Sequence, residues 1–178
     1  GKKTLLVDAD PQGNATSGVA IDKSKVKFST YSILVDGAKA EQCVLTTPYD
    51  NLHILPSSLD LAAAELEIAE KPHREALLKN ALLPIKQYYD YIIIDCPPSL
   101  GLITANALTV ADTFLVPIQC EYYALEGLTQ LIHTINLVKR KLNPELELEG
   151  VVFTMYDART NLSLQVVENV KENLGQNI

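Results

Sequence analysis

Three aspartates follow apolar runs at two places in this 178-residue sequence. Asp8 and Asp10 come after the run at residues 4–7, and Asp95 comes directly after the run at residues 92–94. Short apolar runs bounded by turn residues predict buried strands, and parallel sheets bind ligands at the carboxyl ends of their strands. Carboxylates at that edge suit Mg²⁺ on a nucleotide, because this hard cation prefers carboxylate and water oxygens.

Each of these patterns has a simpler interpretation when it is taken alone. Asp8 and Asp10 can simply end a strand that Pro11 stops, although neighbouring carboxylates repel each other unless a cation, water or hydrogen bonds compensate. An apolar run followed by one aspartate is common in α/β proteins. The combination of Asp-Ala-Asp-Pro-Gln at residues 8–12 with a second strand that ends at Asp95 is far more specific. It favours a nucleotide site.

The composition is that of a globular chain, with 47% hydrophobic and 21% charged residues. The net charge of −7 argues against a protein that coats nucleic acid through bulk charge, although it allows a local basic patch. Three scattered cysteines without a C-x-x-C or Cys/His spacing indicate neither a disulfide framework nor a zinc site. No apolar run reaches the roughly 18 residues of a membrane span. We therefore expect a cytoplasmic protein without a membrane partner.

Strands that alternate with helices predict the α/β class with a mainly parallel, doubly wound sheet. Pro84 should kink or split one helix, and Ser57 or Ser58 should cap another. The residues between 11 and 18 are expected to form a turn-rich loop, and residues 44–49 are ambiguous. The predicted strands are 4–7, 51–56, 91–95, 113–118 and 148–155, and the predicted helices are 29–35, 57–70, 73–88, 102–110, 124–142 and 161–174.

Two of these segments resemble motifs of the ParA family, the deviant Walker-type ATPases of chromosome and plasmid partitioning. Residues 7–16 are similar to the switch I motif of the family, and residues 92–99 are similar to its Walker B motif with the start of switch II. Residues 119–127 and 154–161 also resemble the Soj group of this family. The resemblance covers essentially the whole chain and implies a sheet of the P-loop NTPase type.

The resemblance also implies roles for single residues. Asp10 is similar to the catalytic carboxylate that orients the water attacking the γ-phosphate of ATP, and phosphoryl transfer depends mostly on such positioning. Asp95 would hold Mg²⁺ through water, and Asp8 would support either the magnesium shell or the loop. Three further residues are implied as switch or nucleotide contacts: Thr16, Pro97 and Met155.

Arg159 matches a position through which Soj-like dimers contact DNA non-specifically, and such a contact would weaken as salt rises. The alternative is a surface arginine paired with a nearby acid such as Asp157. For the intact parent protein, the resemblance implies an ATP-dependent homodimer that binds non-specific DNA and associates with the nucleoid. It also implies a ParB-type partner that stimulates hydrolysis.

The glycine-rich phosphate-binding loop of the family has no counterpart in this sequence. No G-x-x-x-x-G-K-[ST] pattern occurs in the sequence. Gly101 lies near the segment that resembles Walker B, and Gly127 lies in a predicted helix, so neither replaces the loop. We therefore expect a fragment of a single ParA-type domain over residues 1–178, incomplete before residue 1 and after residue 178. We expect that it neither hydrolyses ATP nor dimerises alone, and that an open slot beside residues 92–94 invites aggregation.

Other functions remain open at this stage. A membrane-associated positioning ATPase of the MinD type belongs to the same class, although the segment at residues 157–162 favours ParA. A phosphoacceptor module also places acids at strand ends, but the separation of Asp8 from Asp95 is long for the compact receiver pattern. A non-catalytic adaptor that lacks the phosphate-binding loop is the third alternative.

Overall fold

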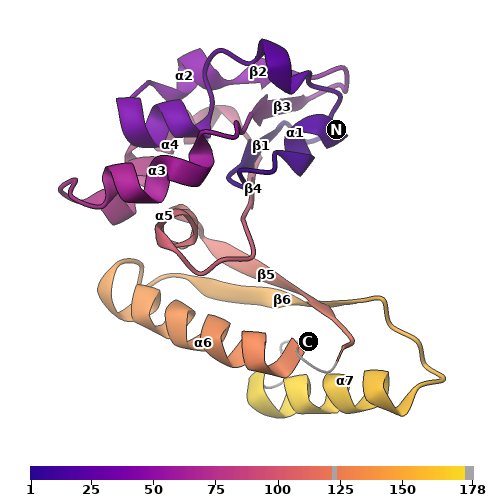
Figure 1. Cartoon of the computed structure of the whole chain (residues 1–178). Helices are drawn as coiled ribbons and strands as arrows, with labels where there is room; N and C mark the ends of the chain where they lie inside the picture. Colours follow the sequence, from indigo (N-terminus) through magenta and orange to yellow (C-terminus); the bar gives the residue numbers. More distant parts are fainter. Residues whose placement is uncertain (122–123, 175–178) are drawn as a thin grey trace. The chain divides into compact units, whose positions relative to one another are not determined.

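The computed structural model describes residues 1–121 and 124–174. It separates into two compact units, residues 1–110 and residues 111–178, and each unit has its own sheet (Figure 1). The α/β class with mainly parallel strands is confirmed, and the single-domain organisation stays a prediction.

The first unit contains a four-stranded sheet in the order β2-β3-β1-β4. Its central strand β1 is parallel to both neighbours, and only the short β2 runs antiparallel, against β3. The β1–β4 register places Asp8 opposite Asp95. The sequence pattern thus brings both carboxylates to the same edge of the sheet. The strands are β1 (Thr4–Asp8), β2 (Leu45–Thr46), β3 (Leu52–Leu55) and β4 (Tyr91–Asp95).

β4 is the last strand of this sheet. In the part of the chain that the structure describes, β4 pairs with β1 and with no other strand. Tyr91 and Ile93 of β4 are exposed. β4 is thus an edge strand within the first unit. The open slot beside residues 92–94 and the aggregation expected from it stay predictions.

Five α-helices and four 3₁₀- or π-helical segments pack around this sheet. Leu5 and Val7 of β1 are fully buried, together with Leu61 of α3 and Leu82 of α4. The strand whose carboxyl end carries Asp8 is therefore part of the apolar core. The elements are α1 (Asn14–Gly18), α2 (Ala40–Cys43), α3 (Leu61–Ile68), α4 (Leu77–Leu82), α5 (Leu102–Val110), the 3₁₀ turns η1 (Lys23–Lys25), η3 (Arg74–Ala76) and η4 (Lys86–Tyr88), and the π-helical η2 (Ser32–Asp36).

Two local predictions for this unit were wrong. The expected loop after Pro11 contains the short helix α1. The helix expected from Ser57 or Ser58 begins at Leu61 with Asp60 in the N-cap position, so neither serine caps it. Both serines make other contacts. The amide of Ser57 donates to Thr16, and the hydroxyl of Ser58 pairs with that of Ser29.

The expected split at Pro84 is confirmed, because α4 ends at Leu82 and η4 begins at Lys86. The predicted helix 73–88 is also divided near its start, because residues 74–76 form a separate 3₁₀ turn before α4. The ambiguous segment at residues 44–49 supplies the edge strand β2.

The second unit pairs two parallel strands and covers them with two helices (Figure 1). Val116 and Ile118 of β5, Leu128 of α6, and Val166 and Val170 of α7 form its buried core. The predicted elements are confirmed to within one residue. They are β5 (Thr113–Gln119), α6 (Ala124–Lys141), β6 (Glu147–Thr154) and α7 (Asn161–Leu174). Among the described residues, none of the helices combines the length and the apolar character needed to cross a membrane.

Candidate active site

The carboxylate of Asp8 is fully buried at the end of β1 and holds the loop that follows it. Its Oδ2 accepts hydrogen bonds from the amide of Thr16 (2.7 Å) and from the hydroxyl of Thr16 (2.6 Å). Its Oδ1 accepts one from the amide of Asp10 (3.2 Å). These donors offset the cost of burying the charge, and charge-assisted bonds of this kind are strong. One side chain therefore fixes both ends of the loop.

A second set of buried contacts ties this loop to the end of β3. The amide of Ser57 donates to the Thr16 hydroxyl oxygen at 3.0 Å. The hydroxyl of Thr30 donates to the carbonyl of Asp8 at 2.7 Å, and the amide of Thr30 donates to the carbonyl of Pro56 at 2.9 Å. All these polar groups find partners inside the unit, so the loop geometry depends on the folding of residues far apart in sequence.

Asp10 is half-buried at the turn between β1 and α1. Its Oδ1 accepts from the amide of Gln12 at 2.9 Å, and its carbonyl accepts from the amide of Gly13 at 2.9 Å. Gly13 has a φ of +63°, and a Cβ there would lie 2.9 Å from Cδ of Lys23. Lys23 in turn donates to the carbonyl of Gln12 at 2.8 Å. The turn that carries Asp10 therefore requires glycine at position 13.

Asp95 ends β4 next to these two acids. Its carbonyl accepts from the amide of Ala9 at 2.8 Å, which joins the ends of β1 and β4. Partial desolvation raises the pKa of Asp95, and the negative charges of Asp8 and Asp10 raise it further. Ionised carboxylates repel each other here, and a cation would relieve that repulsion.

The residues after Asp95 form an exposed to half-buried loop that contains Pro97. Burial, followed by the charge of Asp95, raises the pKa of the neighbouring Cys96 thiol to about 12. This thiol therefore stays protonated near neutral pH and is a poor nucleophile.

Glu65 of α3 holds the other end of the same loop. Its Oε1 accepts from the amide of Ile103 at 3.2 Å, at the N-terminus of α5. A side chain at Gly101 would collide with the Glu65 carboxylate. The hydroxyl of Thr104 donates to the carbonyl of Ser99 at 2.6 Å. An internal carboxylate thus satisfies an orphan amide of the helix and complements its dipole.

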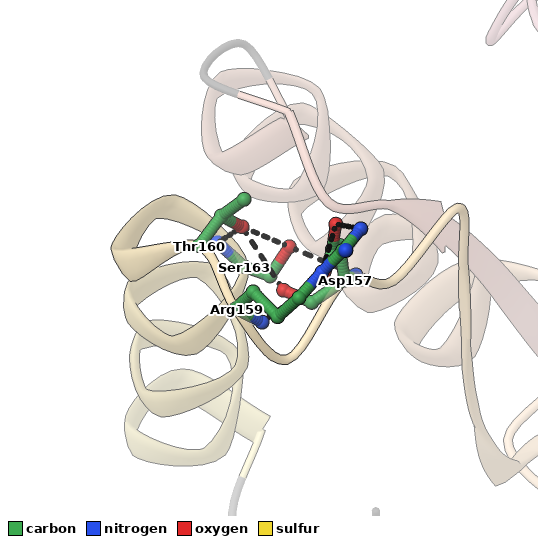
Figure 2. A network of polar contacts seen from close by, with 4 residues as sticks. All are labelled: Asp157, Arg159, Thr160 and Ser163. Atoms are coloured by element: carbon green, nitrogen blue, oxygen red, sulfur yellow. Dashed lines mark hydrogen bonds and ion pairs between the residues drawn. The ribbon is translucent and has the colours of Figure 1, made fainter.

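Arg159 lies in the second unit, in the loop between β6 and α7 (Figure 2). Its Nε and Nη2 donate to Oδ1 (2.9 Å) and Oδ2 (2.8 Å) of Asp157. The Arg159 side chain is 89% exposed, and the pair lowers the pKa of Asp157. The paired surface arginine is thus the arrangement in the structure, while the DNA contact stays a prediction.

The same loop leads directly into α7. The hydroxyl of Thr160 accepts from the amide of Ser163 at 3.3 Å, as an N-cap residue does. The amide of Asp157 donates to the Ser163 hydroxyl at 3.3 Å (Figure 2). Met155, the last predicted nucleotide contact, is 78% exposed and has a φ of +54°.

The structure therefore brings five of the predicted residues to one edge of the first sheet, while Met155 and Arg159 belong to the second unit. The five are Asp8, Asp10, Thr16, Asp95 and Pro97. Their individual roles stay predictions. The Asp8 carboxylate accepts from Thr16 and from the amide of Asp10, and the Thr16 hydroxyl also accepts from the amide of Ser57.

The carboxylates at this edge suit Mg²⁺ if water and phosphate oxygens complete its coordination. Within the residues that the structure describes, no group of three or more His, Cys, Asp or Glu side chains could chelate a metal ion. Mg²⁺ usually keeps several waters and takes one or two carboxylates together with phosphate oxygens. The raised pKa of Asp95, caused in part by two neighbouring acids, is the observation that favours a cation here.

Sequence reasoning missed three residues that shape the site: Thr30, Ser57 and Glu65. Their partners lie 22, 41 and 38 residues away in the chain, so no local sequence pattern indicates these contacts. Only Ser57 carried a signal, as a hydroxyl residue directly after the predicted strand 51–56, and that signal was equally compatible with a helix cap. Thr30 and Glu65 lie inside predicted helices and carried none.

Comparison with known proteins identifies the family and several relatives of this chain. Residues 1–148 match the family described as "AAA domain". The chain is 56% identical over 172 residues to the sporulation initiation inhibitor protein Soj of Bacillus subtilis (strain 168), which covers 97% of this chain and 68% of that protein. It is 51% identical over 170 residues to the chromosome partitioning protein ParA of Myxococcus xanthus, covering 96% of this chain. The chain spans 60% of that ParA protein.

Solved structures with the same fold include a cobyrinic acid a,c-diamide synthase from Mycobacterium smegmatis with bound ATP analog and magnesium. It has a TM-score of 0.89 and 39% identity, and the match covers 97% of this chain and 70% of that one. A plasmid partition protein from Borrelia burgdorferi has a TM-score of 0.79 and 29% identity, over 96% of this chain and 72% of that one.

Proposed function

The chain belongs to the Soj/ParA family of AAA-domain ATPases, and from this membership we propose that it forms part of an ATP-hydrolysing site that serves chromosome or plasmid partitioning. The observation that carries the proposal is the position of Asp8, Asp10 and Asp95 at two adjacent strand ends. The chain spans only 60% to 68% of the length of the two curated relatives described above. The activity proposed here is therefore that of the whole protein.

Asp10 orients the water that attacks the γ-phosphate. Two contacts support this role: the hydrogen bond from its amide to Asp8, and the bond from the amide of Gln12 to its own carboxylate. A side chain held in this way loses little freedom when a substrate arrives, and most of the catalytic effect in phosphoryl transfer comes from positioning. Asp8 and Thr16 act through Asp10 by fixing the loop.

Asp95 holds the magnesium ion through water. When bound, Mg²⁺ neutralises negative charge on the phosphates. The exposed carboxylate of Asp95 suits a water-mediated contact, whereas the buried carboxylate of Asp8 already accepts three hydrogen bonds. Thr16, Pro97 and Met155 are proposed as contacts of the nucleotide or of the switch, with Thr16 acting through its place in the loop.

Partitioning requires more than hydrolysis. We propose that the whole protein forms an ATP-dependent homodimer at the nucleoid, that this dimer binds DNA non-specifically with the help of Arg159, and that a ParB-type partner stimulates hydrolysis. Contact of Arg159 with a DNA phosphate requires exchange of its Asp157 partner for the phosphate. The high exposure of the Arg159 side chain makes this exchange accessible.

ATP turnover of two proteins tests the proposal: this 178-residue chain, and the same chain preceded by the phosphate-loop segment of the B. subtilis Soj relative. The extended protein should hydrolyse ATP with Mg²⁺, and the chain alone should not, because it has no glycine-rich loop with which to hold the phosphates. Asp10→Ala should abolish turnover in the extended protein. Equal rates for the two proteins would contradict the expectation.

A matched control separates this effect from a general loss of charge. Asp50 is an exposed aspartate in the turn before β3, so Asp50→Ala should leave turnover in the extended protein unchanged. If Asp50→Ala lowers the rate as much as Asp10→Ala does, the assignment of Asp10 fails.

A further inference from the structure

The side chain of Lys23 reaches back to the turn that carries Asp10. The peptide group between Gln12 and Gly13 lies in this turn and is bonded at both ends. Its carbonyl accepts from Nζ of Lys23 at 2.8 Å, and its N–H donates to the carbonyl of Asp10 at 2.9 Å. The amide of Gln12 donates to Oδ1 of Asp10 at 2.9 Å. Gln12 therefore links the lysine to both the backbone and the carboxylate of Asp10.

Gly13 leaves the space that the Lys23 side chain occupies. A Cβ at position 13 would lie 2.9 Å from Cδ and 3.5 Å from Nζ of Lys23. The aliphatic part of the lysine thus passes over Gly13 before its ammonium group meets the carbonyl of Gln12. Lysine stems often pack in this way while the charged end stays in water. A packing contact and a charged hydrogen bond therefore fix the same side chain on the same turn.

The backbone of Lys23 is itself held in place. The amide of Ile21 donates to the carbonyl of Thr16 at 3.2 Å, which brings the chain back towards the end of α1. The 3₁₀ turn η1 begins at Lys23, and the carboxylate of Asp22 caps it by accepting from the amide of Ser24 at 3.0 Å. The lysine therefore projects from a capped turn that is anchored to the helix after Asp10.

Lys25 lies in the same 3₁₀ turn but has a different partner. Its Nζ pairs with Oδ2 of Asp22 at 3.2 Å. Both lysines are exposed and both carry one positive charge. Lys23 bonds to the segment that carries Asp10, whereas Lys25 bonds within its own turn. Lys25 therefore offers a matched control for any effect of charge alone.

A cation on the Gln12 carbonyl strengthens the other bonds of the turn. Hydrogen bonds from a charged donor are stronger than those between neutral groups. Such a donor also polarises the peptide group, so that the N–H at its other end becomes a better donor. That N–H bonds to the carbonyl of Asp10. The ammonium group thus tightens the turn at the residue that bears the candidate catalytic carboxylate.

We propose that Lys23 is a positioning residue for Asp10. It acts through Gln12 by holding the turn in which the Asp10 carboxylate is oriented, and it contacts neither the nucleotide nor the attacking water. This inference rests on the role proposed above for Asp10. Loss of the ammonium group loosens the turn and leaves the fold intact, because Lys23 is exposed and the buried bonds between Asp8 and Thr16 remain.

Amide hydrogen exchange of the 178-residue chain tests the hold on the turn without any nucleotide. Lys23→Met keeps most of the aliphatic stem and removes the charged donor. The amides of Gln12 and Gly13 should then exchange several-fold faster, because both donate to Asp10 within the turn. Lys23→Arg keeps a cationic donor and should retain most of the protection. Lys25→Met removes the same charge and should leave the exchange of both amides unchanged.

Turnover of the extended protein, which carries the phosphate-loop segment, tests the consequence for catalysis. Lys23→Met should lower kcat by about tenfold and leave the KM for ATP nearly unchanged, because a loosened Asp10 fails in the transition state and not in nucleotide binding. Lys23→Arg should restore most of kcat, and Lys25→Met should match the parent. All three variants should keep the melting temperature of the parent, since both lysines are exposed.

Several outcomes would overturn the proposal. They are unchanged exchange or unchanged kcat in Lys23→Met, equal changes in Lys23→Met and Lys25→Met, and a raised KM with unchanged kcat, which would make Lys23 a nucleotide contact. Failure of the proposed function is seen separately, with a different variant. If Asp10→Ala leaves turnover unchanged, the role of Asp10 and the catalytic part of this inference both fall, and the exchange rates still decide whether Lys23 holds the turn.

Discussion

The loop after β1 and the loop after β6 both leave the carboxyl end of a parallel strand, but different kinds of contact hold them. The hydrogen bonds of the first loop are buried and join Thr16 to Asp8 and to Ser57, residues 8 and 41 positions away. The ion pair of the second loop is exposed and joins Asp157 to Arg159, two positions away. The first loop depends on the fold of its whole unit, whereas the second loop is held locally.

The titration of the two regions differs in the same way. Partial burial and two neighbouring acids raise the pKa of Asp95, whereas a neighbouring arginine lowers the pKa of Asp157. Carboxylates that repel each other are poised to receive a cation, and a carboxylate already paired with a cation is not. The first loop thus holds carboxylates whose mutual repulsion a cation would relieve, and the second holds an ion pair that is open to solvent.

The largest effect should come from Thr16→Val, which keeps the shape of the side chain and removes its hydroxyl. Asp8 then loses a donor and the amide of Ser57 loses its acceptor, both in a buried setting. We expect the free energy of unfolding of the first unit to fall by about 2–4 kcal/mol. Urea denaturation followed by circular dichroism measures this change.

Thr16→Ser is the matched control, because serine keeps the hydroxyl and loses only a methyl group. It should cost no more than about 1 kcal/mol. If the valine and serine variants are equally stable, the buried network does not hold the loop, and the contrast between the two regions fails.

The second prediction concerns the contact between α3 and α5. Glu65→Ala removes the acceptor of the Ile103 amide, so it should lower the free energy of unfolding by about 1 kcal/mol. Gly101→Ala should cost a similar amount, because the new Cβ displaces the Glu65 carboxylate. The two substitutions should not add, since each disrupts the same contact. Additive losses in a double-mutant cycle would show that Glu65 and Gly101 act separately.

The third prediction is a stabilisation. The folded-state pKa of Asp95 is raised above its ordinary value of 3.8, so the folded state binds this proton more tightly than the unfolded state does. The ionised carboxylate therefore costs stability, and the cost grows as the pH rises from 3.8 through the raised pKa. Asp95→Asn removes this cost. At neutral pH it should raise the free energy of unfolding by less than about 1 kcal/mol after solvent screening.

Denaturation at two pH values checks the sign of this effect. The difference between Asp95→Asn and the parent should vanish when the pH lies below 3.8, because the carboxyl group is then protonated in both states. A variant that is less stable than the parent at neutral pH would show that the three acids do not repel each other in the folded chain.

The same contrast between local and distant contacts explains how much could be predicted from the sequence. The elements of the second unit follow from helical spacing and apolar runs alone, and the predicted bounds of residues 161–174 match α7. The pairing of Asp8 with Asp95 follows from the rule that parallel strands end at one edge.

What the sequence could not predict depends on partners that are distant along the chain. Ser57 is an adequate helix cap by composition, but its amide bonds to a buried threonine 41 residues earlier, and the helix begins only at Leu61. The short helix α1 replaces an expected loop, and the amide of its Thr16 bonds to the Asp8 carboxylate. Tertiary contacts overrode local preference at both places, and both lie at the candidate site.

The smallest effect should come from Asp157→Asn, and its pH dependence should be opposite to that of Asp95→Asn. Arg159 lowers the folded-state pKa of Asp157, so the ion pair stabilises the loop above pH 3.8 and is lost as the pH falls through the lowered pKa. Amide hydrogen exchange of residues 157–160 should be slightly faster in the variant at neutral pH and low salt. This difference should disappear in high salt, because exposed ion pairs are screened. Faster exchange throughout α7 would mean that this exposed pair supports the whole second unit, and the distinction between a local and a distant mode of loop support would then no longer hold.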